Sequence, residues 1–363
     1  MAQYRSLRDF DWVILILTLV ISAAGVLQIY SATHDTPKWE DAWWKQVVWI
    51  FLGLVLMWVA TQIDYHSLLG QVPVLYAATV ALLLGTYLVG TVIFGSRRWI
   101  GVGAFKLQVS EFAKLVIILL VARYLSELKG DSLEGKELLK LAGLIGIPLV
   151  LVLRQPDLGT SLTYTPVLAV GVFLAGLRWK QIAIAVLAFA LASPIVYFSL
   201  QDYQKARLVS FVDPAKDPKG KGYQVIQSKI AIGQGEMWGR GVTKGSQTQL
   251  RFLPVPHTDF IFSAFAEEHG FVGVVVILGL YFLLLMQIVQ NAQLAPDRAG
   301  LYICMGIAAL LLFHVLVNVG MAVGRMPVTG IPLPLMSSGG SNTLSMYLML
   351  GLVNNVRLRR FVN

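Results

Sequence analysis

The chain alternates between long apolar runs and short polar segments, and this alternation restricts it to one class of fold. Hydrophobic residues make up 56% of the chain and charged residues only 13%, more apolar side chain than one water-soluble core buries. Runs of about 17 to 25 apolar residues can cross a bilayer as helices. We find such runs at 12–30, 46–63, 73–94, 110–127, 138–153, 159–176, 181–199, 268–289, 300–324 and 342–356. The sequence therefore predicts an all-α integral membrane protein.

The organisation that follows is one polytopic domain over 1–363, with a long loop at 200–258 between the seventh and eighth spans. An even number of spans places both termini on one side, and positive charge favours the cytoplasm. The basic residues on that side are Arg5, Arg8, Arg123, Lys129, Lys136, Lys140, Arg178, Lys180, Arg357, Arg359 and Arg360. We expect cytoplasmic termini. Cys304, the only cysteine, lies inside the ninth run and predicts packing rather than a disulfide.

The opposite, outer face carries basic residues that the topological bias does not explain. Arg97, Arg98 and Arg154 lie in short segments there, and the 200–258 loop adds more, Lys229 among them. Cations kept on the outer face suggest an anionic ligand such as a phosphate headgroup. For the long loop, a solvated face that contacts anionic lipids is an equal alternative.

Two further groups of charges fall at or near membrane depth. Glu111 and Lys114 are three residues apart at the outer end of the fourth run, so they share a helix face. Ionisable groups in a membrane usually face a bundle interior or a watery cavity, although a self-neutralising pair is the alternative. Arg154 and Asp157 flank a proline in a short turn, where they either bind a ligand or form a loop salt bridge at a helix start.

The segment Gly324 to Asn342 contains three prolines and several glycines before the tenth run, which precludes a regular helix. Irregular backbone near a membrane is tolerated where protein buries it or water reaches it. Ser337 and Ser338, followed by two glycines, could form an anion-binding nest before a helix N-terminus. Transporters use broken segments in the same way, so this pattern does not separate an enzyme from a carrier.

The stretch 253–270, LPVPHTDFIFSAFAEEHG, gathers polar residues beside the eighth run. Asp259 is either a helix cap, as Thr258 could also be, or a functional carboxylate at the outer entrance of a helix. Glu267, Glu268 and His269 are more typical of residues that orient the helix than of a second acid-base set.

The motifs QTQLRFLPVPHTDFIFSAFAEEHGFVG, MPVTGIPLPLMSSGGSN, GSRRWI, QVSEFAKL and RQPDLGTSL closely resemble the SEDS family (shape, elongation, division and sporulation), most closely its RodA-type members. The resemblance spans nearly the whole chain in order. It implies ten transmembrane helices in the bacterial cytoplasmic membrane, an outward-facing site, and polymerisation of peptidoglycan glycan strands from lipid II for cell elongation. It also implies a class B penicillin-binding protein as partner, which supplies crosslinking. Val255 departs from the family, which often has Glu there.

The chemistry of that reaction needs a base for the acceptor hydroxyl and cations for the departing diphosphate. In the family, the Asp of the TDF motif is the proposed catalytic residue, which corresponds to Asp259. Diphosphate binding is expected from Arg97, Arg98 and Lys114, because guanidinium forks match phosphate oxygens. The remaining predicted substrate-binding residues are Glu111, Arg154, Asp157, Lys229, His257, Thr258, Ser337 and Ser338. A divalent cation, Mg²⁺ or Mn²⁺, held by Asp259 or Asp157 and the diphosphate, is a further expectation.

Two other classes of function remain open. A lipid II flippase would use the same cavity and the same cations, although polar groups at depth gather near the outer face rather than along the cytoplasmic half. A scaffold for the growth machinery would make the Asp259 region dispensable. We expect the partner on the eighth and ninth runs and on the long loop, and we expect no nucleic-acid partner.

Overall fold

The computed structural model describes residues 9–93, 96–102, 105–128, 133–177, 202–214 and 220–360, with residues 179–181, 183–184, 187, 190–191, 194, 198 and 217. The helical elements before the long loop are α1 (Trp12–Thr33), α2 (Ala42–Gln62), α3 (Tyr65–Gly70), α4 (Val72–Val89), α5 (Val109–Ser126), α6 (Gly135–Arg154), α7 (Leu158–Leu162) and α8 (Tyr164–Leu174). Those after α8 are α10 (Asp202–Val212), α11 (Lys221–Gln234), α12 (Ser246–Gln249), α13 (Ile261–Gln293), α14 (Arg298–Ala322) and α15 (Gly340–Leu358).

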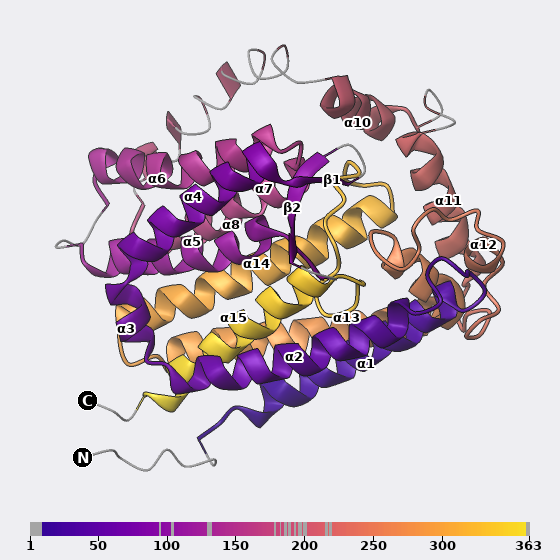
Figure 1. Ribbon diagram of the computed structural model, residues 1–363, viewed down its shortest axis with the longest axis horizontal. Coiled ribbons are helices and arrows are strands. Elements are labelled where there is room, and N and C mark those ends of the chain that lie inside the picture. The colour runs from indigo at the N-terminus through magenta and orange to yellow at the C-terminus, as the bar shows by residue number, and fades with distance from the viewer. Residues whose placement is uncertain are drawn as a thin grey trace.

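The long helices pack side by side as a membrane bundle, with both chain ends close together at one end (Figure 1). In the described part of the chain, α1, α2, α4, α13 and α14 are long and apolar enough to cross a membrane. Both α5 and α6 fall outside that set because each carries several charged side chains. The predicted helical membrane fold is therefore confirmed. The span predicted at 181–199, like Arg5, Arg8, Lys129 and Arg178, lies largely or wholly outside the described residues.

Two predicted spans differ from the structure. The run at 159–176 is divided into α7 and α8. The eighth run was expected to begin at 268, but its helix begins at Ile261 and is broken at Gly270, whose φ of 65° and ψ of −168° are not helical. The polar residues Glu267 and Glu268 hid this beginning, because the prediction required a continuous apolar run.

The break in α13 is held by the segment 236–241, which contributes backbone hydrogen bonds on both sides of it. The Glu267 and Glu268 carbonyls accept from the N–H groups of Arg240 and Gly241 (3.0 and 2.9 Å). Beyond the break, the Phe271 N–H donates to the Glu236 carbonyl at 2.9 Å. An added Cβ at Gly270 would lie 2.3 Å from the Gly239 nitrogen, so the two backbones meet where only glycine fits. The loop thus supplies the partners that the broken helix lacks.

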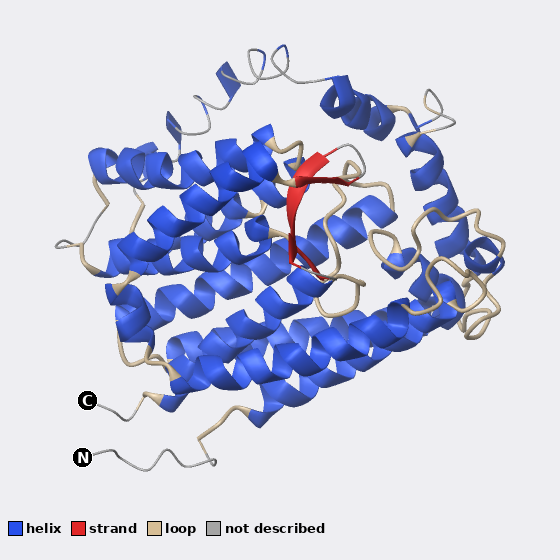
Figure 2. Cartoon of the chain, in the orientation of Figure 1, coloured by secondary structure: helices blue, strands red, loops and turns tan. Residues whose placement is uncertain are grey.

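A small antiparallel sheet interrupts the helical pattern between α4 and α5 (Figure 2). Its strands are β1 (Thr91–Ile93), β2 (Ser96–Val102) and β3 (Phe105–Leu107), in the order β1-β2-β3. Thr91 pairs with Trp99 and Ile100 with Leu107. This hairpin, which the apolar runs did not predict, carries Arg97 and Arg98 on β2.

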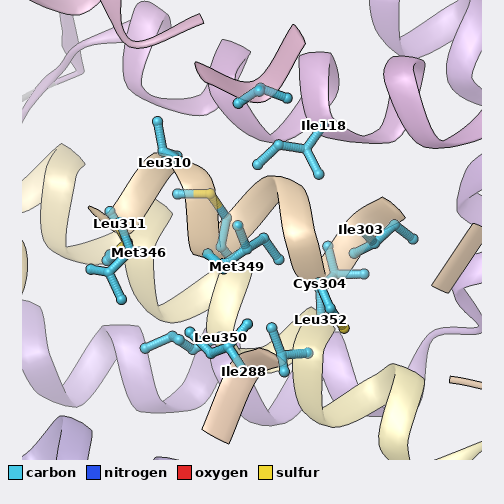
Figure 3. Packing of buried hydrophobic residues seen from close by; sticks show 14 of the residues in the cluster. Ile118, Ile288, Ile303, Cys304, Leu310, Leu311, Met346, Met349, Leu350 and Leu352 are labelled. Carbon is cyan, nitrogen blue, oxygen red and sulfur yellow. The ribbon is translucent and has the colours of Figure 1, made fainter. Parts of the chain in front are cut away.

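The bundle core is formed mainly where α14 and α15 meet α5 and α13 (Figure 3). Ile303, Leu310 and Leu350 are among its fully buried side chains. Cys304 is buried in the same layer, as a packing residue should be. Along α2, α15 packs closely because Gly53 and Gly351 leave room for Tyr347 and for the backbone of Met57. This rigid layer supports the loops at the opposite end from the termini.

Candidate functional site

Asp259 lies in the loop immediately before α13, and its backbone is fixed by α14. The N-cap residue of α13 is Phe260, and no side chain caps that helix end. The alternative of Asp259 or Thr258 as a helix cap is therefore wrong. The Asn318 side chain donates through Nδ2 to the Asp259 carbonyl at 3.0 Å and to the Ile331 carbonyl at 2.9 Å. Asn318 thus joins the Asp259 loop to the irregular segment 323–339.

Ser337 is the second link between these two loops. Its Oγ donates to the Thr258 carbonyl at 2.7 Å and accepts from the Leu333 N–H at 2.9 Å. The Ser338 N–H donates to the His257 carbonyl at 2.9 Å, and the Ser337 N–H donates to Leu333. The predicted anion-binding nest at Ser337 and Ser338 is wrong, because both backbone donors are already used within the protein. Their role is to hold His257 and Thr258 in place.

The carboxylate of Asp259 is partly accessible and lies among cations. Burial raises the pKa of Asp259, while the positive charges of Lys221, Arg98 and Arg207 and a hydrogen bond with Thr258 act in the opposite direction. The backbone of Gly330 lies close to this carboxylate, since a Cβ added at Gly330 would be 3.4 Å from Asp259 Oδ2. A carboxylate with a raised pKa is a stronger proton acceptor than an ordinary aspartate.

The cations come from three separate elements, β2, α10 and α11. Arg207 Nη1 donates to the Thr329 carbonyl at 2.9 Å, which ties α10 to segment 323–339. Burial and the positive charge of Arg207 lower the pKa of Lys221. Like charges held this close are relieved by an anion, so the arrangement favours a negatively charged ligand. This agrees with the anionic ligand predicted for the outer basic residues.

Asp157 lies next to Arg98, and hydrogen bonds hold its carboxylate in place. Its Oδ2 accepts from Gln108 Nε2 at 2.8 Å and from Thr160 Oγ1 at 2.9 Å, and its Oδ1 accepts from the Thr160 N–H at 3.1 Å. Arg98 Nη1 lies 3.3 Å from the same carboxylate. Asp157 therefore caps α7 and pairs with Arg98. Of the two alternatives that the sequence left open, this supports the salt bridge at a helix start, with Arg98 rather than Arg154 as the partner.

Glu111 and Lys114 lie deeper in the bundle than the sequence suggested. Lys114 Nζ donates to Glu111 Oε2 at 2.7 Å and lies 3.2 Å from His314 Nε2, and the Lys114 side chain is fully buried. His314 Nδ1 in turn lies 3.1 Å from the Pro332 carbonyl. The expected contact of Lys114 with a diphosphate is not supported, because the ammonium is paired inside the core. Through His314 and the Pro332 carbonyl, these residues support segment 323–339 from inside the bundle.

The other predicted residues are distributed around this centre. Arg97 and Arg154 are exposed, and Lys229 is exposed with its side chain against Gly324, so none is placed in contact with Asp259. His257 is buried, its ring centre lies 4.7 Å from that of Trp39 with the two planes tilted by 49°, and burial lowers its pKa to about 4. His257 is therefore neutral at pH 7 and cannot act as a cation for phosphate.

Glu267 and Glu268 are structural, as the sequence analysis favoured. Glu267 accepts from the Gln247 N–H at 2.7 Å and from the Thr248 hydroxyl at 2.8 Å. Glu268 accepts from Gln28 Nε2 at 3.3 Å and from the hydroxyl of Ser31, both on α1. Two carboxylates thus connect the first turns of α13 to α12 and α1.

Sequence reasoning missed four residues that shape the site: Arg207, Lys221, Asn318 and His314. The first two were visible only as members of a basic loop. His314 and Asn318 are polar residues four apart in an apolar run, so they share a helix face. That spacing was a usable signal, because polar side chains at membrane depth face the bundle interior.

The donor set does not fit a divalent cation held by the protein. Asp157 already accepts three hydrogen bonds and pairs with Arg98. Asp259 is surrounded by cations. Among the described residues, no three His, Cys, Asp or Glu side chains cluster closely enough to bind a metal ion. A cation held jointly by one of these carboxylates and the substrate diphosphate stays a prediction.

The structure is a helical membrane bundle, and the loops at the end opposite its termini hold a partly accessible carboxylate among cations. These features are typical of polytopic membrane proteins that handle anionic substrates. The family model FTSW_RODA_SPOVE, described as "Cell cycle protein", matches residues 11–360, and the chain belongs to this family.

Curated relatives and solved structures agree with this assignment. "Peptidoglycan glycosyltransferase MrdB" of Escherichia coli (strain K12) is 38% identical, covering 96% of this chain and 94% of that protein. "Peptidoglycan glycosyltransferase RodA" of Treponema pallidum (strain Nichols) is 33% identical, covering 99% and 100%. The crystal structure of the Thermus thermophilus Rod shape determining protein RodA has a TM-score of 0.73 at 32% identity, covering 98% of each chain. A chain from a study of structural coordination of polymerization and crosslinking by a peptidoglycan synthase complex has a TM-score of 0.84 at 36% identity, covering 98% of this chain and 99% of that one.

Proposed function

We propose that this chain polymerises peptidoglycan glycan strands from lipid II during cell elongation, with Asp259 as the general base. The observation that carries the proposal is the Asp259 carboxylate, which is partly accessible, has a raised pKa and lies near Lys221, Arg98 and Arg207. The names of the relatives, peptidoglycan glycosyltransferases that match over nearly the full length of the chain, support it.

The reaction is a single displacement with inversion. The acceptor 4-hydroxyl oxygen attacks C1 of an α-linked sugar, the new β-glycosidic C–O bond forms, and the bond from C1 to the diphosphate oxygen breaks. Asp259 takes the proton that the hydroxyl loses. The raised pKa makes that transfer more favourable, while enough of the carboxylate must still be ionised at neutral pH. No protein nucleophile is needed.

The departing diphosphate gains negative charge as the bond breaks. Arg98 and Arg207 offer guanidinium groups, and Lys221 offers an ammonium, near the Asp259 carboxylate. Cations already fixed by Asp157 and by the Thr329 carbonyl lose little freedom when the charge develops. Thr258 orients the carboxylate through its hydroxyl. Asn318 and Ser337 fix the backbone on which both residues lie.

We place the protein in the bacterial cytoplasmic membrane, with cytoplasmic termini and the Asp259 site outside. The basic residues Arg357, Arg359 and Arg360 at the terminal end support this orientation. A class B penicillin-binding protein is the proposed partner. Of the two helices predicted to meet it, α13 offers the larger apolar surface, with Phe271, Val276 and Phe282 more than half exposed, whereas most of α14 is buried.

The test uses the purified protein in proteoliposomes with labelled lipid II, alone and with its penicillin-binding partner. Asp259→Ala should abolish polymer while membrane insertion and partner binding persist. Glu236→Ala is the matched control, because that carboxylate is exposed and pairs with Arg240 in its own loop. Polymer from Asp259→Ala at the wild-type rate would refute the assignment. Lipid II movement across the bilayer without polymer, in wild type with partner, would favour a flippase instead.

A further inference from the structure

A groove at the terminal end of the bundle lies far from the site described above. It has a volume of about 310 Å³ and is lined by residues of α4, α5 and α6 and by Glu127, just after α5. Figure 1 shows where these three helices lie. Its apolar walls are Val72, Pro73, Tyr76, Leu120 and Leu144. The volume is within the range of about 300 to 1,000 Å³ that small-molecule sites occupy. Proposed catalysis at Asp259 makes no use of it.

The helices that bound this groove present apolar side chains to the outside. Val74 on α4 is 70% exposed and Leu139 on α6 is 75% exposed. In a membrane protein such residues contact hydrocarbon, so the groove is open to the lipid that surrounds the bundle. An acyl chain can therefore reach its walls without crossing water.

The polar part of the groove is built around Arg123, in the last turn of α5. Nη1 donates to the Leu69 and Gly70 carbonyls at 2.9 and 3.1 Å, and Nε donates to Glu127 Oε1 at 3.0 Å. Among the described residues, no hydrogen bond uses Nη2. The guanidinium is thus fixed by α3 and keeps one donor group for a further acceptor.

A second cation lies over Tyr124, the residue that follows Arg123 in the chain. Lys140 Nζ lies 5.3 Å from the centre of the Tyr124 ring, and the Tyr124 hydroxyl donates to Glu137. Tyr124 lines the groove. The polar end of the groove thus holds Arg123, paired through Nε with Glu127, with Lys140 over the neighbouring Tyr124. The unused Nη2 of Arg123 beside apolar walls is complementary to an amphiphile with a negative head. Free phosphate would leave the apolar walls exposed, and a zwitterionic head would gain less from the two cations.

We propose that this groove binds one anionic phospholipid, with an acyl chain along Tyr76, Leu120 and Leu144 and the phosphate at Arg123. The groove lies at the end that carries both termini, so the lipid belongs to the cytoplasmic leaflet in the proposed orientation. The chemistry of the site does not depend on that orientation or on the proposed activity.

The test is native mass spectrometry of the full chain, titrated with phosphatidylglycerol or with phosphatidylcholine of the same acyl chains. Wild type should bind phosphatidylglycerol about fivefold more tightly or better. Arg123→Gln should lose this headgroup preference, whereas Arg298→Gln, which removes an exposed arginine at the same end, should keep it. Leu144→Trp fills the groove and should weaken both lipids, whereas Leu139→Trp, on the outward side of the same helix, should not.

Equal lipid binding by Leu144→Trp and Leu139→Trp would overturn the proposal, and so would an unchanged headgroup preference in Arg123→Gln. Arg123→Lys, which keeps the charge, should retain most of the preference and separates loss of charge from loss of the α3 contacts. Leu144→Trp leaves Arg123 intact, so a folding defect at α3 cannot imitate its effect. Polymerisation by Leu144→Trp should equal that of wild type if the groove is separate from catalysis.

Discussion

Asp11 and Asp259 precede the first turns of two long helices, α1 and α13, and their carboxylates have opposite surroundings. Asp11 Oδ2 accepts from Gln287, Asn291 and Arg357 at 2.7 to 2.8 Å, and Oδ1 accepts from the Ile14 N–H at 3.3 Å. Asp259 has a hydrogen bond with Thr258, and the positive charges of Lys221, Arg98 and Arg207 act on its carboxylate. One carboxylate is saturated by the fold, and the other is left available.

The comparison teaches how to separate structural from functional charge in a membrane bundle. A buried carboxylate with all its lone pairs used joins helices, as Asp11 joins α1, α13 and α15. A carboxylate that is accessible, has a raised pKa and lies near cations is prepared to accept a proton or to face a ligand. Asp157 lies between these cases, because it is saturated but orients Arg98.

The largest effect is expected from Asp259→Asn, which keeps the shape and removes the base. Loss of general-base catalysis should slow polymerisation by about 10²- to 10⁴-fold. The free energy of unfolding should stay the same or rise, because the raised pKa shows that the folded environment disfavours the charged form. Polymerisation assays and thermal unfolding of the same preparation check both parts. A variant that is active but unstable would reverse the comparison.

Asp11→Ala should show the converse behaviour. It leaves Arg357 without its carboxylate and removes the acceptor of Gln287 and Asn291, so the free energy of unfolding should fall by about 3 to 5 kcal/mol. Protein that remains folded should polymerise at the wild-type rate. Asp41→Ala is the control, since that side chain is 73% exposed and its 4.0 Å pair with Lys45 contributes little.

Comparing Ser337→Ala with Ser338→Ala tests whether the Ser337 hydroxyl holds the loop that carries Asp259. Ser337→Ala loses the hydrogen bond to the Thr258 carbonyl, which joins segments 257–259 and 333–337, and the one from the Leu333 N–H within its own segment. This should cost about 1 to 3 kcal/mol of stability and lower the polymerisation rate. Ser338 contributes its backbone N–H to that link, so its substitution should stay within about 0.5 kcal/mol. Thermal unfolding and initial rates distinguish the two. Equal behaviour would mean that the Ser337 hydroxyl does not position Asp259.

The smallest effect is a shift in pH dependence. Stability that comes from protonated Asp259 is complete below the pKa of an unfolded aspartate, about 3.9, and is lost as pH rises through the raised folded-state pKa. Activity rises over the same interval, because the base must be ionised. Lys221→Gln removes a charge that lowers this pKa, so the acidic limb of the rate profile should move to higher pH. Lys244→Gln, at an exposed loop position, should leave it in place.

Much of the fold could be predicted because hydrophobic length alone identifies membrane helices. The spans of α1, α4 and α14 were expected to within several residues. The break at Gly270 and the β2 strand were missed, since both depend on contacts with distant segments rather than on local pattern. Asp259 was identified by a family motif and by the need for a base. Of its cations, Arg98 was among the predicted substrate-binding residues. Arg207 and Lys221 were not, because the approach of α10 and α11 to one carboxylate is a tertiary property.

The hydrogen bonds that segment 236–241 makes on both sides of the break in α13 have a consequence for folding. Without this loop, the Glu267 and Glu268 carbonyls in the first turns of α13 would lack hydrogen-bond donors. Without the break, the N–H groups of Arg240 and Gly241 would lack these acceptors. The two must therefore become ordered together. Because α13 continues directly from Asp259, the proposed catalytic centre would mature only once both are ordered, which would keep a half-folded chain in the membrane from being an active one.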